Sequence, residues 1–213
     1  MNPQNTLDEI RSEIAQCHRC SLADGRKRTV PGEGPTNADI MFIGEGPGFY
    51  ENEQGKPFVG QAGKFLDELL ATAGYERENV FITNVVKCRP PGNRDPQPEE
   101  LTACANYLDR QIAIIQPKVI VTLGRHSMGK YFTNAKISLI HGRAAWVNGQ
   151  LVVAMYHPAA GLHQPNLKST ILADFRKLPE IIEQAKKSEN IQKISRQIEE
   201  ETPEDDATQL SFF

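Results

Sequence analysis

Asp39-Ile-Met-Phe-Ile-Gly44 is a short apolar run that ends in a glycine, and the loop Glu45-Gly-Pro-Gly48 follows it at once. Such a run is typical of a strand that is buried on both faces of a sheet. Two further runs, at residues 79–86 and 117–124, have the same character, and the second also ends in a glycine. These three segments therefore predict the centre of a buried sheet.

Segments with helical spacing of apolar residues separate and follow these runs. They lie at residues 60–74, 98–115, 125–132 and about 167–187. In addition, Asn148-Gly149 stands between two strand-like arms in residues 146–155, which indicates a hairpin. Strands that alternate with helices predict an α/β fold with a parallel sheet covered on both faces.

In sheets of this kind, ligands bind beyond the carboxyl ends of the strands. This rule brings together Glu45 after the first strand, Asn84 near the end of the second and His157 after the last. A buried Asn needs partners for its amide, so Asn84 is either a structural bridge or a reader of a polar ligand edge. The carboxyl edge of the sheet is therefore the predicted site.

Four cysteines, and no others, occur in the chain: Cys17, Cys20, Cys88 and Cys104. Four thiolates suit a tetrahedral zinc ion or a four-cysteine iron–sulfur cluster. Two disulfides or four unrelated buried thiols are the alternatives. The polar N-terminus shows no secretory signal, and a cytoplasmic location, which we expect, disfavours disulfides. No apolar stretch is long enough to span a membrane, so no membrane association is expected.

The charge of the chain is unevenly distributed. The formal net charge is -3, but residues 189–213 hold seven acidic and two basic side chains, so residues 1–188 are slightly basic. We therefore expect one folded domain over residues 1–188, followed by an acidic, disordered tail over residues 189–213. The overall charge does not exclude a polyanionic partner.

Four stretches in order carry a family resemblance: Gly44-Glu-Gly-Pro-Gly48, Lys56-Pro-Phe-Val-Gly60, Thr83-Asn-Val-Val-Lys-Cys-Arg-Pro-Pro91 and His157-Pro-Ala-Ala-Gly-Leu162. Together they resemble the uracil-DNA glycosylase superfamily, and with the four cysteines they resemble its family 4, the iron–sulfur branch. The resemblance covers about residues 10–186. It implies a three-layer α/β/α sandwich around a four-stranded parallel sheet.

The resemblance also implies hydrolysis of the bond between uracil and deoxyribose in DNA. Because no lysine stands in a motif position to form a Schiff base, no lyase activity is expected. It implies a [4Fe–4S] cluster held by Cys17, Cys20, Cys88 and Cys104. It assigns catalytic roles to Glu45 and His157 and substrate-binding roles to Gly46, Phe58, Asn84 and Leu162. On this reading Phe58 stacks on the flipped uracil, Asn84 reads its polar edge, His157 donates to uracil O2 and Leu162 fills the vacated space in the duplex.

Two departures from family 1 leave questions open. Gly46 stands where many of those relatives carry a water-activating aspartate, and Gly48 stands where they carry the tyrosine that excludes the thymine methyl. Phe49, Tyr50 or Glu51 are the candidates to take over that exclusion. Phosphate contacts are expected from polar residues near the loops, namely Lys87, Arg89, Arg94, Arg125, His163, Lys168 and Ser169.

The alternative function is a non-catalytic iron–sulfur or zinc module that binds nucleic acid, in which the site residues need not converge. His126 lies in a loop without the basic insertion expected of relatives that attach covalently to DNA through a histidine, which argues against that branch. The chain ends in Gln209, Leu210, Ser211, Phe212 and Phe213. This ending resembles the bacterial sliding-clamp binding motif and suggests the clamp as a partner. The protein is otherwise expected to be a monomer.

Overall fold

The computed structural model of the protein describes residues 2–201, and it describes the burial of side chains for residues 2–188. A sheet of five strands in the order β2-β1-β3-β5-β4 forms its centre. The strands are β1 (Ile40–Gly44), β2 (Phe81–Asn84), β3 (Val119–Leu123), β4 (Arg143–Val147) and β5 (Gln150–Met155). The first four strands in this spatial order pair in parallel.

The fifth strand is the one difference from the expected four-stranded sheet. β4 pairs with β5 in the antiparallel direction. The turn between them is the predicted hairpin: Asn148 and Gly149 have φ of 51° and 79°, and these two residue types tolerate that left-handed backbone. The four parallel strands are therefore as predicted, and the hairpin adds an antiparallel edge.

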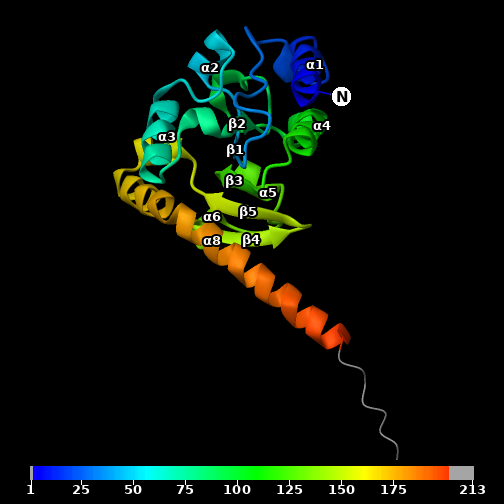
Figure 1. Ribbon diagram of the computed structural model, residues 1–213. Helices are drawn as coiled ribbons and strands as arrows, with labels where there is room; N and C mark the ends of the chain where they lie inside the picture. The colour runs from blue at the N-terminus through cyan, green and yellow to red at the C-terminus, as the bar shows by residue number, and fades with distance from the viewer. Residues whose placement is uncertain (1, 202–213) are drawn as a thin grey trace, which may run out of the picture.

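Helices cover both faces of the sheet, which makes the three predicted layers (Figure 1). α3 (Gln61–Thr72), α7 (Pro158–His163) and α8 (Pro165–Glu201) pack on one face, where side chains such as Phe42 and Val121 point. α1 (Pro3–Ala15) and α4 (Pro98–Ile115) pack side by side on the other face, over Met41 and Ile120. The period of two along β1 and β3 thus divides the core between the layers.

Three further helices are short: α2 (Phe49–Gln54), α5 (Arg125–Gly129) and α6 (Ile137–Ile140). Single 3-10 turns occupy Ser21–Ala23, Arg77–Asn79 and Pro91–Asn93. α1 was not among the expected helices, although Leu7, Ile10 and Ile14 are buried at helical spacing. The side chain of Asn2 caps this helix by accepting a hydrogen bond from the Gln4 N–H.

α8 runs farther than expected. The sequence indicates a helix to about Lys187 and a tail from residue 189, whereas the helix continues to Glu201 and extends away from the sheet (Figure 1). Residues 188–201 contain no Gly or Pro and are rich in Glu, Gln, Lys and Arg, which have high helix propensity. Residues 202–213, with the clamp-like ending, lie outside the described residues.

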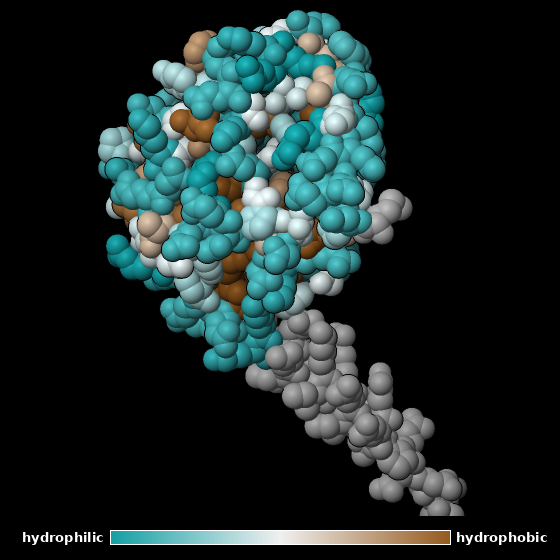
Figure 2. Space-filling view, turned by 45° about the horizontal axis from the view of Figure 1, so that its top comes forward, coloured by the Kyte–Doolittle hydropathy of each residue, from teal (hydrophilic) through white to brown (hydrophobic). Residues whose placement is uncertain are grey.

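The surface seen in Figure 2 is mostly hydrophilic, and its hydrophobic residues form separate patches. Among the helices of the described part, none combines the length and apolar character that crossing a membrane requires.

Candidate active site and four-cysteine site

A cavity of about 510 Å³ opens at the carboxyl ends of the strands. Its wall contains five of the six residues predicted to act on substrate: Glu45, Gly46, Phe58, Asn84 and His157. The sixth, Leu162, does not line the cavity. It lies on α7, 43% exposed, next to His163, which does line it. The cavity volume is in the range of small-ligand sites.

Asn84, the last residue of β2, is 1% exposed. Its Oδ1 atom has no hydrogen-bond partner among the described residues. Leaving a buried carbonyl oxygen unpaired is costly, and few such groups occur in a folded protein. The orphaned oxygen of Asn84 therefore marks a position where a ligand hydrogen-bond donor fits.

Gly44 leaves the space that Asn84 and Phe58 occupy. A Cβ atom on Gly44 would lie 2.4 Å from Asn84 Oδ1 and 2.6 Å from Phe58 Cζ. Both distances are shorter than real contacts, so a side chain at Gly44 would displace both groups. The end of β1 thus has to be a glycine for the cavity to keep its shape.

We expect Gly44→Ala to lower activity by at least about tenfold and to destabilise the fold by about 1–3 kcal/mol, as overpacking does. Thermal unfolding and steady-state kinetics measure both effects. Gly25→Ala is the matched control, because a Cβ there meets nothing within 4 Å. A Gly44→Ala protein as active as the Gly25→Ala protein would contradict this account of the cavity.

Phe58 is held in an unusual conformation. Its φ is 52°, in the left-handed region, and its side chain is 6% exposed. Its ring stacks near the His157 ring, with centroids 5.6 Å apart and an interplanar angle of 29°. A non-glycine residue with this backbone persists only where its surroundings hold it.

Glu51 is the group that holds this loop, and sequence reasoning missed that role. Its Oε1 accepts hydrogen bonds from the Val59 and Gly60 N–H groups, both at 2.8 Å. Its Oε2 accepts one from the Gly48 N–H at 3.1 Å. The carboxylate is thus committed to backbone contacts, which leaves Phe49 and Tyr50, both more than half exposed at the cavity wall, as the remaining candidates for methyl exclusion.

His157 has a defined protonation state. The Ala159 N–H donates to its Nδ1 at 3.1 Å, so in the neutral ring the hydrogen is on Nε2. Burial lowers the pKa of His157 to about 4, although the nearby Glu51 carboxylate opposes the shift. At neutral pH the side chain is therefore an uncharged donor.

This protonation state gives a pH prediction. Because the pKa of about 4 in the folded protein lies below the ordinary 6.5, His157 should stay neutral, with its hydrogen on Nε2, at pH 5.5. Its contribution to stability should be complete above about pH 6.5 and fall as the pH drops toward 4. Nitrogen-15 NMR of the imidazoles, with His157→Gln to assign the signal, measures this. A His157 signal that titrates near pH 6.5 would contradict the geometry.

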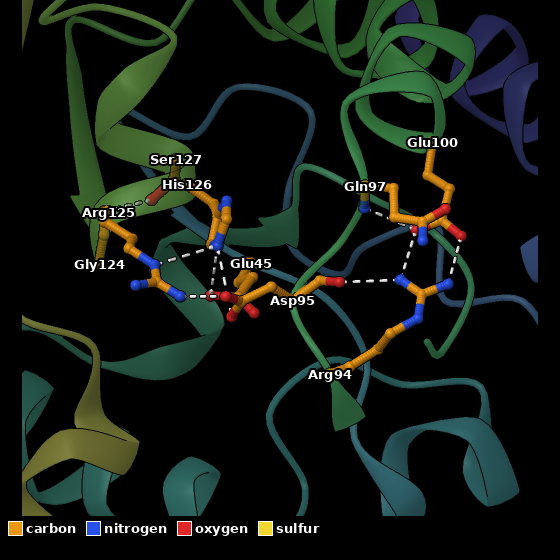
Figure 3. Close-up of polar contacts among 9 residues, drawn as sticks. All are labelled: Glu45, Arg94, Asp95, Gln97, Glu100, Gly124, Arg125, His126 and Ser127. Carbon is orange, nitrogen blue, oxygen red and sulfur yellow. Dashed lines mark hydrogen bonds and ion pairs between the residues drawn. The ribbon is translucent and has the colours of Figure 1, made fainter. Parts of the chain in front are cut away.

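Glu45 lies at the cavity wall within a cluster of charged side chains (Figure 3). Its Oε2 is 3.8 Å from His126 Nε2, which is 3.5 Å from Asp95 Oδ1. Burial raises the pKa of Glu45, and the Asp95 carboxylate raises it further. His126 and Arg125 act in the opposite direction. Arg125 also pairs with Asp95. The carboxylate of Glu45 is thus partly buried and flanked by the Arg125 cation, the His126 imidazole and a second carboxylate, Asp95.

The four cysteines converge on a second, small cavity between α1, α4 and the loop after β2. All four are free thiols. The alternative of two disulfides is therefore wrong. Arg19, Arg26 and Lys87 also line this cavity, and Arg26 Nη1 lies 3.7 Å from Cys88 Sγ. Three cationic side chains around four thiols suit a negatively charged, thiolate-bound centre.

The sulfur atoms of the four cysteines do not lie as close together as the ligands of one zinc ion do. Four thiolates on zinc at 2.3 Å lie about 3.8 Å apart. Among the described residues, no three of the cysteine sulfurs lie within 4.8 Å of one another, whereas the ligand atoms of Glu45, Asp95 and His126 do. Burial also raises the pKa of Cys88 to about 11, so this thiol needs a bound cationic centre to ionise.

The expected phosphate contact of Lys87 is wrong. It is 1% exposed, and its Nζ donates to Thr83 Oγ1, the Asn84 carbonyl and Gln111 Oε1 at 2.6, 2.8 and 2.8 Å. All three ammonium protons are therefore used inside the protein, and Lys87 cannot reach DNA.

Most of the other side chains expected to contact phosphate already have a partner within the protein. Arg94 pairs with Glu100 and Arg125 with Asp95, while Lys168 lies 4.0 Å from Glu68. Ser169 donates to the Asn166 carbonyl. The guanidinium of Arg89 stands over the Phe49 ring at 5.3 Å.

Comparison with known proteins identifies the family. The uracil DNA glycosylase superfamily matches residues 31–177. The type-4 uracil-DNA glycosylase of Sulfurisphaera tokodaii is 48% identical over 83% of this chain and 85% of its own. That of Saccharolobus solfataricus is 47% identical over 84% and 87%, and that of Thermotoga maritima 42% over 85% and 98%. The chain therefore belongs to the uracil-DNA glycosylase superfamily, in its type-4 branch.

Proposed function

We propose that this protein is a uracil-DNA glycosylase that hydrolyses the N-glycosidic bond of uracil in DNA and so begins base-excision repair. The observation that carries the proposal is the unpaired, buried amide oxygen of Asn84 in one cavity with Phe58 and His157. Its type-4 relatives bear the name of this activity. The alternative, a non-catalytic module, gives no reason for such convergence.

Recognition follows from the amide. Uracil presents an acceptor at O4 and a donor at N3, and Asn84 offers the complementary donor and acceptor. Cytosine presents the opposite pattern and would leave the buried amide unpaired, a strong basis for rejection. A base within a duplex has to flip out to reach the cavity, and we propose that the exposed Leu162 fills the gap it leaves.

Catalysis then needs charge stabilisation and a positioned water. As the bond breaks, negative charge develops on the uracil, and the Nε2–H of neutral His157 is the donor we assign to O2. Phe58 stacks on the ring, and the Gly46 backbone lets the base approach closely. Glu45, at the same cavity wall, is assigned to orient the water that attacks the sugar.

We also propose that the protein has no lyase activity. A Schiff base requires a free lysine amine close to the sugar. Lys87, close behind Asn84, donates to three partners and is buried. We therefore propose hydrolysis alone, with no strand cleavage by the protein.

For the cysteine site we propose a [4Fe–4S] cluster bound by Cys17, Cys20, Cys88 and Cys104. The unpaired thiols, their cationic surroundings and their wide spacing support it. When bound, the cluster supplies a covalent tie between the segment after α1, the loop after β2 and α4. Because Cys88 follows Asn84 by four residues, that tie would brace the loop that leaves the uracil-reading strand.

The proposed partner is uracil-containing DNA, held by the exposed basic side chains around the cavity. We further propose that a monomer acts in the cytoplasm and that the ending Gln209–Phe213 binds the sliding clamp. Deleting residues 209–213 should abolish retention on immobilised clamp while excision stays unchanged. Equal retention of the full-length and shortened chains would contradict clamp binding through this motif.

The test of the activity is a uracil-containing oligonucleotide treated with the purified, brown protein and then with alkali. Strand breaks at uracil, and none in the matched thymine oligonucleotide, are the expected result. Omitting alkali should leave the strand intact. Binding of the oligonucleotide without any alkali-sensitive site would favour the non-catalytic alternative.

A further inference from the structure

A continuous series of polar contacts leads from the cysteine site to Glu45. It begins at Ser21, which is next to Cys20. The Oγ of Ser21 donates to Glu100 Oε1 at 3.1 Å. Arg94 donates to both oxygens of Glu100, at 2.9 and 2.6 Å. These residues come from the segment after α1, the loop after β2 and α4. The first half of the series thus joins three elements that meet at the cysteines.

Glu100 is the residue in which the hydrogen bonds of this first half meet. It is 2% exposed, and it also accepts from the Gln97 N–H at 2.8 Å, which caps α4. The Arg94 guanidinium, with the Gln97 N–H and Ser21, lowers the pKa of Glu100 to about 2. A two-pronged Arg–carboxylate pair with additional donors is rigid. It therefore fixes the loop of residues 89–97.

The second half of the series runs from Arg94 to the active site (Figure 3). Arg94 Nη1 also donates to the Asp95 carbonyl at 2.8 Å. The Asp95 side chain points the other way, to Arg125 and to His126 Nε2 at 3.5 Å. His126 in turn lies 3.8 Å from Glu45 Oε2 and is 18% exposed. His126 thus lies between Glu45 and Asp95, and Asp95 belongs to the loop of residues 89–97.

We propose that Asp95 and His126 are positioning residues for Glu45, and that the Arg94–Glu100 pair holds Asp95 in place. This inference rests on the proposed function, because Glu45 orients the attacking water there. It assigns the loop after the uracil-reading strand a second task, which is to fix the carboxylate across the cavity. The alternative is that the contacts only stabilise the fold.

A double-mutant cycle separates the two readings. His126→Ala is expected to lower the single-turnover rate of excision about tenfold while the Kd for uracil-containing DNA stays unchanged. In the Glu45→Gln background, the same change should lower the rate by less than about twofold, because the group it positions is already gone. Asp95→Asn should behave in the same way. Because both residues are at least partly exposed, these variants should fold.

Asp109→Asn is the matched control. It breaks the ion pair with Lys130 at the far end of α5 and should leave the rate unchanged in both backgrounds. Multiplicative losses from His126→Ala with and without Glu45 would overturn the proposal, as would a loss that appears in Kd. Wild-type protein without excision activity would instead defeat the proposed function, so the two failures are distinct.

Discussion

Replacing Asn84 by alanine is expected to lower the rate of uracil excision by about 100- to 1,000-fold, the effect typical of losing a polar contact that forms with the reacting group. The same change should leave the protein as stable as before or more stable. Both expectations arise from one observation, that Asn84 Oδ1 is buried without a partner. The amide stabilises no protein contact through that oxygen, so its removal relieves an unpaired group.

Steady-state excision and thermal unfolding of the same preparation measure the two effects. Asn79→Ala is the matched control, because Asn79 stands just before β2 and its amide contacts Glu76 instead. That variant should keep full activity. An Asn84→Ala protein with near wild-type excision would contradict the assignment of the uracil-reading residue. A large loss of stability would show that the amide is a structural bridge.

Replacing Cys104 by serine is expected to remove the iron–sulfur cluster and to lower the melting temperature by about 10 °C or more. The physical reason is that a metal site contributes its binding free energy to folding, and about 3 kcal/mol in a chain of this size shifts the melting temperature by that amount. Wild-type protein should contain about four iron and four sulfide per chain.

Iron and sulfide analysis with thermal unfolding measures this, and limited proteolysis should cut the Cys104→Ser protein near Cys17 and Cys20. Thr102→Ala, an exposed change on the same helix, is the control and should retain the cluster. One zinc per chain without iron would contradict the cluster. An unchanged melting temperature in Cys104→Ser would contradict its role as a tie between α4 and the N-terminal segment.

The strands and the residues of the cavity follow closely from the sequence. Apolar runs that stop at glycine predict β1 and β3, and Asn148-Gly149 predicts the β4–β5 hairpin. The rule that ligands bind at the carboxyl edge then collects Glu45, Asn84 and His157, because parallel strands end at the same edge.

What the sequence does not predict depends on side-chain hydrogen bonds that form only in the folded chain. From the sequence, Lys87 is expected to be a surface cation. In the structure it is buried and donates hydrogen bonds to Thr83 and Gln111. The role of Glu51 depends on N–H groups of a loop that follows it, at Val59 and Gly60. Helix α1, in contrast, could have been predicted, because Leu7, Ile10 and Ile14 have helical spacing.

The proposed function requires that the cavity at the strand ends releases uracil by hydrolysis. Mass analysis of the products from a single-uracil oligonucleotide tests it most directly. The account predicts free uracil and an uncut strand with one abasic site, and no release of cytosine or thymine from matched strands. Intact substrate, or a strand cut by the protein before alkali is added, would contradict it.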